Sequence, residues 1–318
     1  MRSFLAALFA ALSVAAYAQD YPTKPIRVVV PFAPGGSSSI MARAFGAEMS
    51  VTLGQSLIID NRPGGGGNVA MNEVAHAAPD GYTLIIGHIG TLAVNPFMYQ
   101  HLPYDVNKDF VAVSLLAKVP TIFVVHASVP AKDLREFIAL AKKNPGKLFF
   151  GSAGNGSAGH LAIEYLKLVS GMDIVHVPYK GTGPNLLDLV AGRTQFSAAG
   201  TPPFLPHVKS GKLRVVAVGT PHRLPILPDV PTVAEQGYPG FETSQWYGLN
   251  APAGTPPEIL ERLAHAAALA AKSASVLKQL EPDSALAVGS TPKEYADYIA
   301  LEQKRWKEVV QKAHVKAD

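Results

Sequence analysis

The chain of 318 residues contains no cysteine, and charged residues are scarce at 16%. Without cysteine there is no disulfide framework, no thiolate metal ligand and no thiol nucleophile, so the fold has to rest on its hydrophobic core. The chain is instead 48% hydrophobic and carries 28 glycines and 26 prolines. This composition predicts short strands, many turns and extensive buried faces, and the length fits two domains.

Charges of the two signs are nearly balanced, with 28 Lys and Arg residues against 24 Asp and Glu and a formal net charge of +4. The chain has no basic run and no stripe of basic residues interleaved with aromatics, so we expect no nucleic-acid partner. The ten histidines are scattered, and no HExxH or paired-histidine spacing occurs. We therefore expect neither a metal site nor a cofactor.

The first 18 residues, MRSFLAALFAALSVAAYA, form a separate segment. Arg2 supplies a positive start, a short apolar run follows, and Ala16-Tyr17-Ala18 forms a small-x-small cleavage site. The run is shorter than the ~20 residues that span a bilayer. We interpret residues 1–18 as a cleaved signal peptide, which predicts export and a periplasmic location.

The remainder alternates strand and helix patterns. We expect strands at 26–32, 56–60, 82–87, 147–152, 173–179, 194–199, 213–219 and 245–252, and helices at 40–54, 69–77, 132–143, 158–171, 181–192, 256–273 and 291–313. Repeated strand-helix units predict an α/β fold with mainly parallel sheets covered by helices. The proline-rich segment 223–241 has no regular period, and we expect an ordered loop there.

The apolar segment VAVSLLAKVPTIFVVH at 111–126 is interrupted by Pro120. We interpret it as two strands in different sheets, joined by a crossover, because it is long for one strand. A second crossing near 242–247 then divides the chain into two lobes. One lobe would comprise 19–118 and 245–318 and the other 119–244, with a hinge and a ligand cleft between them.

One stretch in each expected lobe combines a strand, a Gly/Ser loop and a helix. The loops read APGGSSS at 33–39 and GSAGNGSAG at 151–159. Glycines let the backbone approach a ligand closely, and free N–H groups at a helix start favour an anion. Two such loops facing each other would hold a carboxylate from both sides.

The second loop also contains Gly154-x-Gly156-x-x-Gly159, the spacing of a dinucleotide-binding turn. That motif requires an acidic residue at the end of the following strand. Asp173 instead lies at the start of that strand, and Tyr179-Lys180 end it. We therefore favour a site for a smaller anion over NAD.

Catalytic motifs are weak. No Gly-x-Ser-x-Gly occurs, and Ser275-Val276-Leu277-Lys278 matches a serine-lysine motif without its KTG partner. An exported hydrolase that uses an exposed serine stays open as the competing class. A receptor that presents its ligand to a signalling system is a third reading, which the sequence alone does not separate from transport.

Several segments together resemble one family: YPTKPIRVVVPFAPGG, IIDNRPGGGGN, AAPDGYTLIIG, NPFMYQHLPYD, KNPGKLFFGSAGNGSAGHLA, VHVPYKGTGP, LPHVKSGKLRVVAV and LPDVPTVAEQGYPGFE. They look like the extracytoplasmic solute-binding receptors of tripartite tricarboxylate transporters, the Bug family. The resemblance runs from Tyr21 to the C-terminal helix. It implies a type II periplasmic-binding-protein fold, no catalysis, a small carboxylate ligand and membrane permease subunits as partners. We expect the receptor to act as a monomer.

The resemblance also implies a ligand site built from both Gly/Ser loops and their neighbours. Carried onto this sequence, the ligand-binding residues are Phe32, Ala33, Gly36, Ser37, Ser38, Ser39, His88, Thr91, Ser152, Ala153, Gly154, Asn155, Ser157, His160, Tyr179, Ala199 and Gly200. Trp246 and Tyr247 fit either hinge packing or ligand stacking. The run NRPGGGGN at 61–68 fits either a tight turn or the rim of the cleft.

Two departures from the family pattern bear on the ligand. Ser39 stands where members often carry aspartate, and Ala198-Ala199-Gly200 stands where they often carry Phe-Asp. An aspartate in the cleft would suit an ammonium group and repel a second carboxylate. This chain is therefore expected to reject amino acids and to accept a dicarboxylate or a bulkier anion, including an aromatic, terephthalate-like one.

Overall fold

The computed structural model describes residues 21–281 and 284–313. Its strands are β1 (Ile26–Val30), β2 (Leu57–Asn61), β3 (Thr83–His88), β4 (Phe110–His126), β5 (Phe149–Ser152), β6 (Val175–Pro178), β7 (Phe196–Gly200), β8 (Leu213–Val218), β9 (Ser244–Pro252) and β10 (Leu286–Ala287). The longer helices are α2 (Ser37–Leu53), α3 (Asn68–Ala75), α6 (Leu134–Lys143), α7 (Ala158–Ser170), α8 (Thr182–Val190), α9 (Thr201–Lys209), α10 (Pro257–Lys272) and α12 (Pro292–Ala313). Shorter helical pieces are η1 (Gly65–Gly67), η2 (Gly90–Val94), α4 (Asn95–Met98), α5 (Val106–Asp109) and α11 (Ala274–Leu280).

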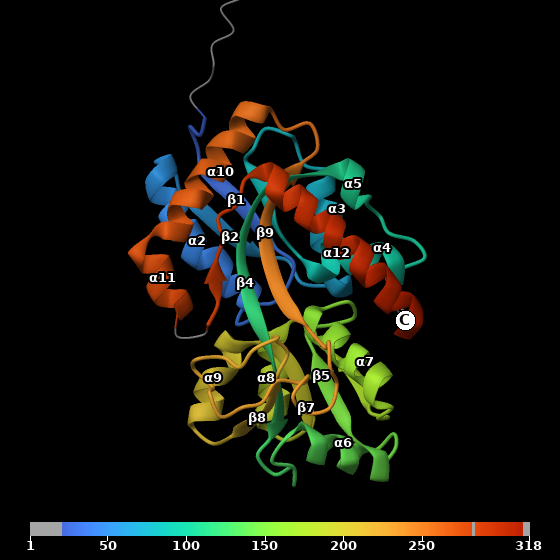
Figure 1. The fold of residues 1–318 in the computed structure, drawn as a ribbon. Coiled ribbons are helices and arrows are strands. Elements are labelled where there is room, and N and C mark those ends of the chain that lie inside the picture. The colour runs from blue at the N-terminus through green and yellow to red at the C-terminus, as the bar shows by residue number, and fades with distance from the viewer. Residues whose placement is uncertain (1–20, 282–283, 314–318) are drawn as a thin grey trace, which may run out of the picture.

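The molecule has two lobes, stacked one above the other in Figure 1. In lobe 1, the apolar β1 pairs in parallel with β2 and β3, and β3 pairs with β9 in antiparallel fashion. In lobe 2, β5 lies between β6 and β7 as a parallel set, and β7 pairs with antiparallel β4. This is the α/β architecture that the strand and helix pattern predicts.

Strand β4 belongs to both lobes, and here the expectation of two separate strands was wrong. Residues Phe110 to Pro120 pair with β9, whereas Thr121 to Val125 pair with β7 on the lobe 2 side. The proline is tolerated because it lies where β4 leaves one partner for the next, and a missing N–H costs little at such a change of partner. The change of sheet near Pro120 therefore occurs within one continuous strand.

Each sheet is covered by helices on both faces. In lobe 1, one hydrophobic cluster lies under α2, α10 and α11, and another lies under α3, η2 and α12. In lobe 2, one cluster lies under α6 and α7, and the other lies under α8, α9 and the 223–241 segment. As expected, 223–241 forms neither a helix nor a strand, and Thr232 makes a single bridge to Val218. Each lobe therefore has its own core, made of two hydrophobic clusters on opposite faces of its sheet.

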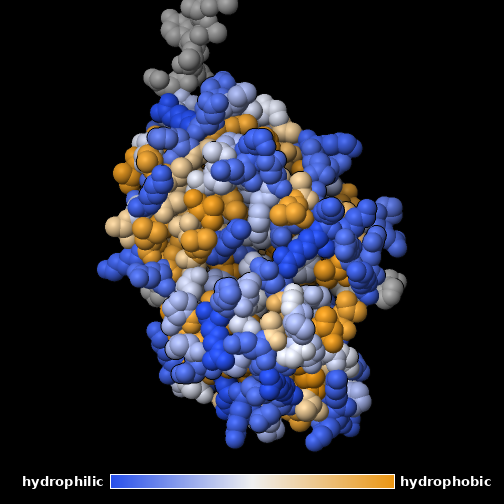
Figure 2. Space-filling view, viewed as in Figure 1, coloured by the Kyte–Doolittle hydropathy of each residue, from blue (hydrophilic) through white to orange (hydrophobic). Residues whose placement is uncertain are grey.

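Apolar residues are unevenly distributed over the surface of the molecule. Apolar residues gather over the region of α2, α10 and α11, whereas the visible face of lobe 2 is mainly hydrophilic (Figure 2). Exposed apolar side chains of these elements and of the neighbouring β10 include Val51, Leu269, Leu277 and Leu286.

Candidate functional site

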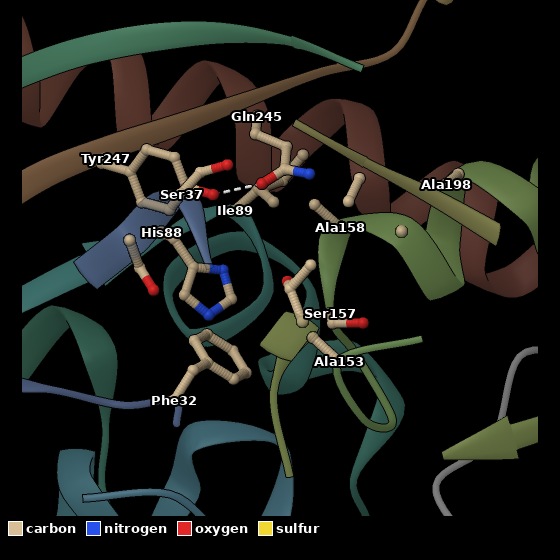
Figure 3. Close-up of a pocket in the computed structure, with 14 residues that line it drawn as sticks. Phe32, Ser37, His88, Ile89, Ala153, Ser157, Ala158, Ala198, Gln245 and Tyr247 are labelled. Carbon is tan, nitrogen blue, oxygen red and sulfur yellow. Dashed lines mark hydrogen bonds between the residues drawn. The ribbon is translucent and has the colours of Figure 1, made fainter. Parts of the chain in front are cut away.

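A cavity lies between the lobes where the Gly/Ser loops meet. Its lining residues are Phe32, Ser37, Ser38, His88, Ile89, Ala153, Ser157, Ala158, Gly159, Thr182, Ala198, Ala199, Gln245 and Tyr247. The space between its walls, including the opening to solvent, is about 400 Å³. Figure 3 shows Ser37 and Tyr247 on the lobe 1 side facing Ser157 and Ala153 from lobe 2. The structure thus brings the two predicted helix starts to one cavity.

The N-termini of three helices converge on this cavity. Helix α2 begins at Ser37 and helix α8 at Thr182, each after a glycine and without a side-chain cap on its first turn. Helix α7 is capped by Ser157, whose hydroxyl accepts from the His160 amide at 3.4 Å. An uncapped helix start leaves backbone N–H groups free and carries a partial positive charge. The sequence pointed to α2 and α7, and the structure adds α8.

Among the described residues that line the cavity, none is a lysine, arginine, aspartate or glutamate. Its polar groups are serine and threonine hydroxyls, an amide, a phenol and one imidazole. An anion bound here would therefore be held by hydroxyls, N–H groups and helix dipoles rather than by an ion pair. Without a carboxylate in the wall, the cavity also has no group that would specifically pair with a ligand ammonium.

His88 provides a donor of fixed orientation. The amide of Gly90 donates to its Nδ1 at 2.8 Å, so the proton of the neutral ring lies on Nε2. Burial lowers the pKa of His88 to about 3, which keeps the ring neutral at physiological pH. Among the described residues, Nε2 has no hydrogen-bond partner, and the Phe32 ring lies against the imidazole at 4.6 Å between centroids.

A second, wider hollow opens beside this cavity. The two share Phe32 and Ala153, and the further lining comprises Gly64, Gly65, Gly66, Gly67, Tyr99, Gly154, Asn155, Pro178, Tyr179 and Lys180. Its space, including open solvent, is about 700 Å³. The glycine run 64–67 lines this hollow and also forms the tight turn η1, so both interpretations of the segment hold.

The remaining predicted site residues lie outside both linings and support them: Ala33, Gly36, Ser39, Thr91, Ser152, His160 and Gly200. The Ser39 hydroxyl lies 3.5 Å from the side-chain oxygen of Asn61, which also donates through Nδ2 to the Phe32 carbonyl at 2.7 Å. The Thr91 hydroxyl donates to the carbonyl of His88. A role of these residues in direct ligand contact stays a prediction.

Ser152 and His160 shape the lobe 2 loop from within. The Ser152 hydroxyl is 2.6 Å from Nε2 of His176 and accepts from the Gly154 amide at 3.1 Å. The His160 ring stacks on His176 and accepts from the Gly156 amide through Nδ1. Ser152 is fully buried, and this serine-histidine contact supports the loop from within.

The predicted ligand-binding residues did not include six residues of the cavity lining, and Tyr247 was left undecided. The six are Ile89, Ala158, Gly159, Thr182, Ala198 and Gln245. Gln245 and Tyr247 lie two apart on β9, so both face the cavity, whereas Trp246 points to the opposite side. There the Trp246 indole donates to buried Glu302 on α12 at 2.9 Å. Side chains alternate between the two faces of the predicted strand 245–252. This alternation could have assigned Gln245 and Tyr247 to one face and Trp246 to the other.

The fold and this interlobe cavity define a two-lobed solute-binding protein. The family profile described as tripartite tricarboxylate transporter family receptor matches residues 41–315. This chain belongs to that family.

Three relatives illustrate the match. A Rhodopseudomonas palustris protein, Rpa4515, solved with adipate, is 38% identical with a TM-score of 0.89, and the match covers 92% of this chain and 98% of that one. MatC from the same organism, solved with bound malate, is 37% identical with a TM-score of 0.88, over 91% of this chain and 100% of that one. Protein BugT of Bordetella pertussis is 36% identical over 94% of this chain and 92% of its own length.

Other sequence predictions meet the structure only partly. The signal-peptide prediction for 1–18 lies outside the described residues. No helix within 21–281 and 284–313 has both the length and the apolar character needed to cross a bilayer. Over the same ranges, no three His, Asp or Glu side chains group closely enough to hold a metal ion.

Proposed function

We propose that this protein is a periplasmic receptor that captures a small dicarboxylate and delivers it to the membrane subunits of a tripartite tricarboxylate-type transporter. The observation that carries the proposal is the uncharged cavity onto which three helix N-termini open, α2, α7 and α8. Such a site binds anions through hydrogen-bond donors. Two relatives with 37–38% identity were solved with the dicarboxylates malate and adipate, which supports the same ligand class here.

The residues that line the cavity favour acids without an ammonium group. Its wall carries Ala198 and Ala199 where family members often carry a bulkier and an acidic residue. Small side chains therefore form the lobe 2 wall, and the aromatic rings of Phe32 and Tyr247 form part of the wall that faces it (Figure 3). A flat aromatic dicarboxylate such as terephthalate could stack on those rings. The proposal therefore includes both aliphatic and aromatic diacids and excludes aspartate and glutamate.

A binding role without catalysis fits the surroundings of the serines. The Ser157 hydroxyl caps α7, and the nearby His160 uses Nδ1 to accept from a backbone amide. No hydrogen bond joins Ser37 or Ser38 to His88 in the cavity (Figure 3), and none of the described lining residues carries a carboxylate that could act as their base. A hydrolase would require such a base within hydrogen-bond reach of its nucleophile.

The test is a thermal-shift and calorimetry panel on the purified protein. The acids are malate, adipate, terephthalate, aspartate and glutamate, with hexanoate as the monoacid control for adipate. A diacid at 100 times its Kd should add about 2.7 kcal/mol to the free energy of unfolding. Strong binding of aspartate or glutamate with no response to malate, adipate or terephthalate would reject the proposal. Conversion of a bound ligand to product would favour the hydrolase instead.

A further inference from the structure

Gln245 lies at the junction of the two lobes. It is the second residue of β9 and pairs with Val119 of β4, beside the Pro120 position where β4 changes sheet. The residue is 7% exposed, and it lines the interlobe cavity together with Ser37 and Tyr247. A polar side chain is thus buried on the strand that connects the lobes, apart from the loops and helix starts.

The neighbouring tyrosine fixes the orientation of the Gln245 amide. The Tyr247 hydroxyl donates a hydrogen bond to Oε1 of Gln245, which occupies the oxygen end of the amide. The nitrogen end must then point the other way, and Figure 3 shows it directed towards the space beside Ile89 and Ala158. Within the described part of the chain, Gln245 Nε2 donates to no protein group.

Gln245 Nε2 is not one of the fully buried polar atoms that lack a partner, so it faces the open space of the cavity, where an acceptor can reach it. The polar side chains around this cavity are hydroxyls, the amide itself, and a histidine whose acceptor nitrogen is already occupied by Gly90. No carboxylate lines the wall to accept from Gln245. Water or a hydroxyl oxygen can accept from this nitrogen in the ligand-free protein, and a ligand carboxylate that displaces the water gives the stronger, charge-assisted hydrogen bond.

We propose that Gln245 donates a hydrogen bond from Nε2 to a carboxylate oxygen of the bound ligand, so that the strand joining the lobes helps to select the acid. This inference rests on the proposed function. Tyr247 acts as a positioning residue, because it holds the amide with its nitrogen towards the ligand. Gln245 is then a specificity-determining residue that acts in addition to the Gly/Ser loops.

Two variants test the proposal by calorimetry with adipate and malate. Gln245→Met keeps the length of the side chain and removes the donor, and it should weaken binding about 10- to 100-fold. Gln245→Glu places a carboxylate against the ligand and should weaken binding at least about tenfold further. Gln279→Glu on exposed α11 makes the same charge change away from the cavity and should bind as the wild type does.

The outcomes distinguish a failure of this inference from a failure of the proposed function. Unfolding midpoints of the ligand-free variants are measured first, and they should stay close to that of the wild type. If the wild type binds a diacid while Gln245→Met and Gln245→Glu bind within twofold of it, the inference is wrong and the function stands. Equal losses in both variants also overturn it, because they indicate packing rather than charge. If Gln245→Glu does not fold, a loss below tenfold in Gln245→Met is the overturning result. Failure of the wild type to bind any diacid overturns the proposed function itself.

Discussion

The backbone amide of Ala33 donates a hydrogen bond to the carbonyl oxygen of Lys180 at 3.0 Å, and this bond joins the loop after β1 to the loop after β6. The lobes also approach each other closely at two glycines of lobe 1, where a side chain would not fit. A Cβ built on Gly90 would lie 2.1 Å from the Gly156 carbonyl oxygen, and one on Gly66 would lie 2.2 Å from that of Asn155. The structure is therefore a closed form in which glycines allow the lobes to touch.

Adding a methyl group at Gly90 should hold the lobes apart. Gly90→Ala places a methyl group against the Gly156 backbone carbonyl and 2.5 Å from Cε1 of His88, and overpacking of this kind costs about 1–3 kcal/mol. If ligand binding requires closure, affinity should fall about 5- to 150-fold. Calorimetry gives the affinity, and small-angle scattering with ligand should show a larger radius than for the wild type. Gly46→Ala, inside α2 and facing the flexible end of Ile59, is the matched control. Unchanged affinity in Gly90→Ala would show that binding does not need this contact.

Ala199 gives a test of ligand charge. Ala199→Asp places a carboxylate in the cavity wall, and its repulsion of a ligand carboxylate is on the order of 4 kcal/mol at 4 Å and an effective dielectric of about 20. Affinity for adipate or malate should fall more than about 100-fold, while that for aspartate should rise. The control Ala199→Asn has nearly the same shape without the charge. A similar loss in both variants would attribute the effect to size.

Stability should depend on pH through His88. Its pKa is lowered to about 3, whereas the unfolded ring titrates near 6.5, so the unfolded chain takes up the proton first. The stability that this group contributes is fully present above pH 6.5 and is lost as the pH falls from 6.5 towards 3. Between pH 7 and 5 the loss is about 2 kcal/mol. His88→Asn offers an oxygen to the Gly90 amide and does not titrate.

The measurement for His88 is urea unfolding at several pH values. His88→Asn should show a free energy of unfolding that falls less steeply on acidification than in the wild type, by about 2 kcal/mol between pH 7 and 5. His265→Asn, at an exposed position of α10, should keep the wild-type slope. Identical slopes in the wild type and His88→Asn would contradict the assignment of a buried neutral imidazole.

Glu302 should matter for stability because it is buried and accepts from two indoles. Trp246 Nε1 donates to it at 2.9 Å and Trp306 Nε1 at 3.2 Å. Glu302→Leu leaves both N–H groups unpaired, and at about 1–3 kcal/mol each the free energy of unfolding should fall by about 2–6 kcal/mol. Glu302→Gln keeps an acceptor oxygen and should lose less. Chemical denaturation measures both, with Glu308→Gln on the exposed side of α12 as the control, and a loss below 1 kcal/mol in Glu302→Leu would contradict the role.

The sequence predicted the elements better than their boundaries. Apolar runs such as 26–32 and periodic segments such as 291–313 were found because burial imposes period 2 or 3.6 on the side chains. Helix α2 begins at Ser37 rather than at residue 40, since the serines form its first turn instead of a preceding loop. The short β10 and α11 were not predicted, because a two-residue strand and a seven-residue helix carry too little pattern.

The candidate site was predictable where it depends on local chemistry. Ser37, Ser38, Ser157 and Ala153 line the cavity because a glycine-rich turn before a helix has few other conformations. Gln245 and Thr182 come from other parts of the chain, and their positions depend on how the lobes pack. Ser39 and His160 were expected to face the ligand, yet the first turn of each helix directs them to Asn61 and to the loop backbone. Direct ligand contact by any of these residues is still a prediction.

The continuous strand β4 has a mechanical consequence. Because β4 and β9 run antiparallel and stay paired as far as Pro120 and Ser244, the connection between the lobes is a ladder rather than a pair of free tethers. Such a ribbon resists stretching and shear and yields mainly by twisting. Opening of the receptor should then be a torsion along one axis, which varies the width of the entrance but leaves its two edges in register.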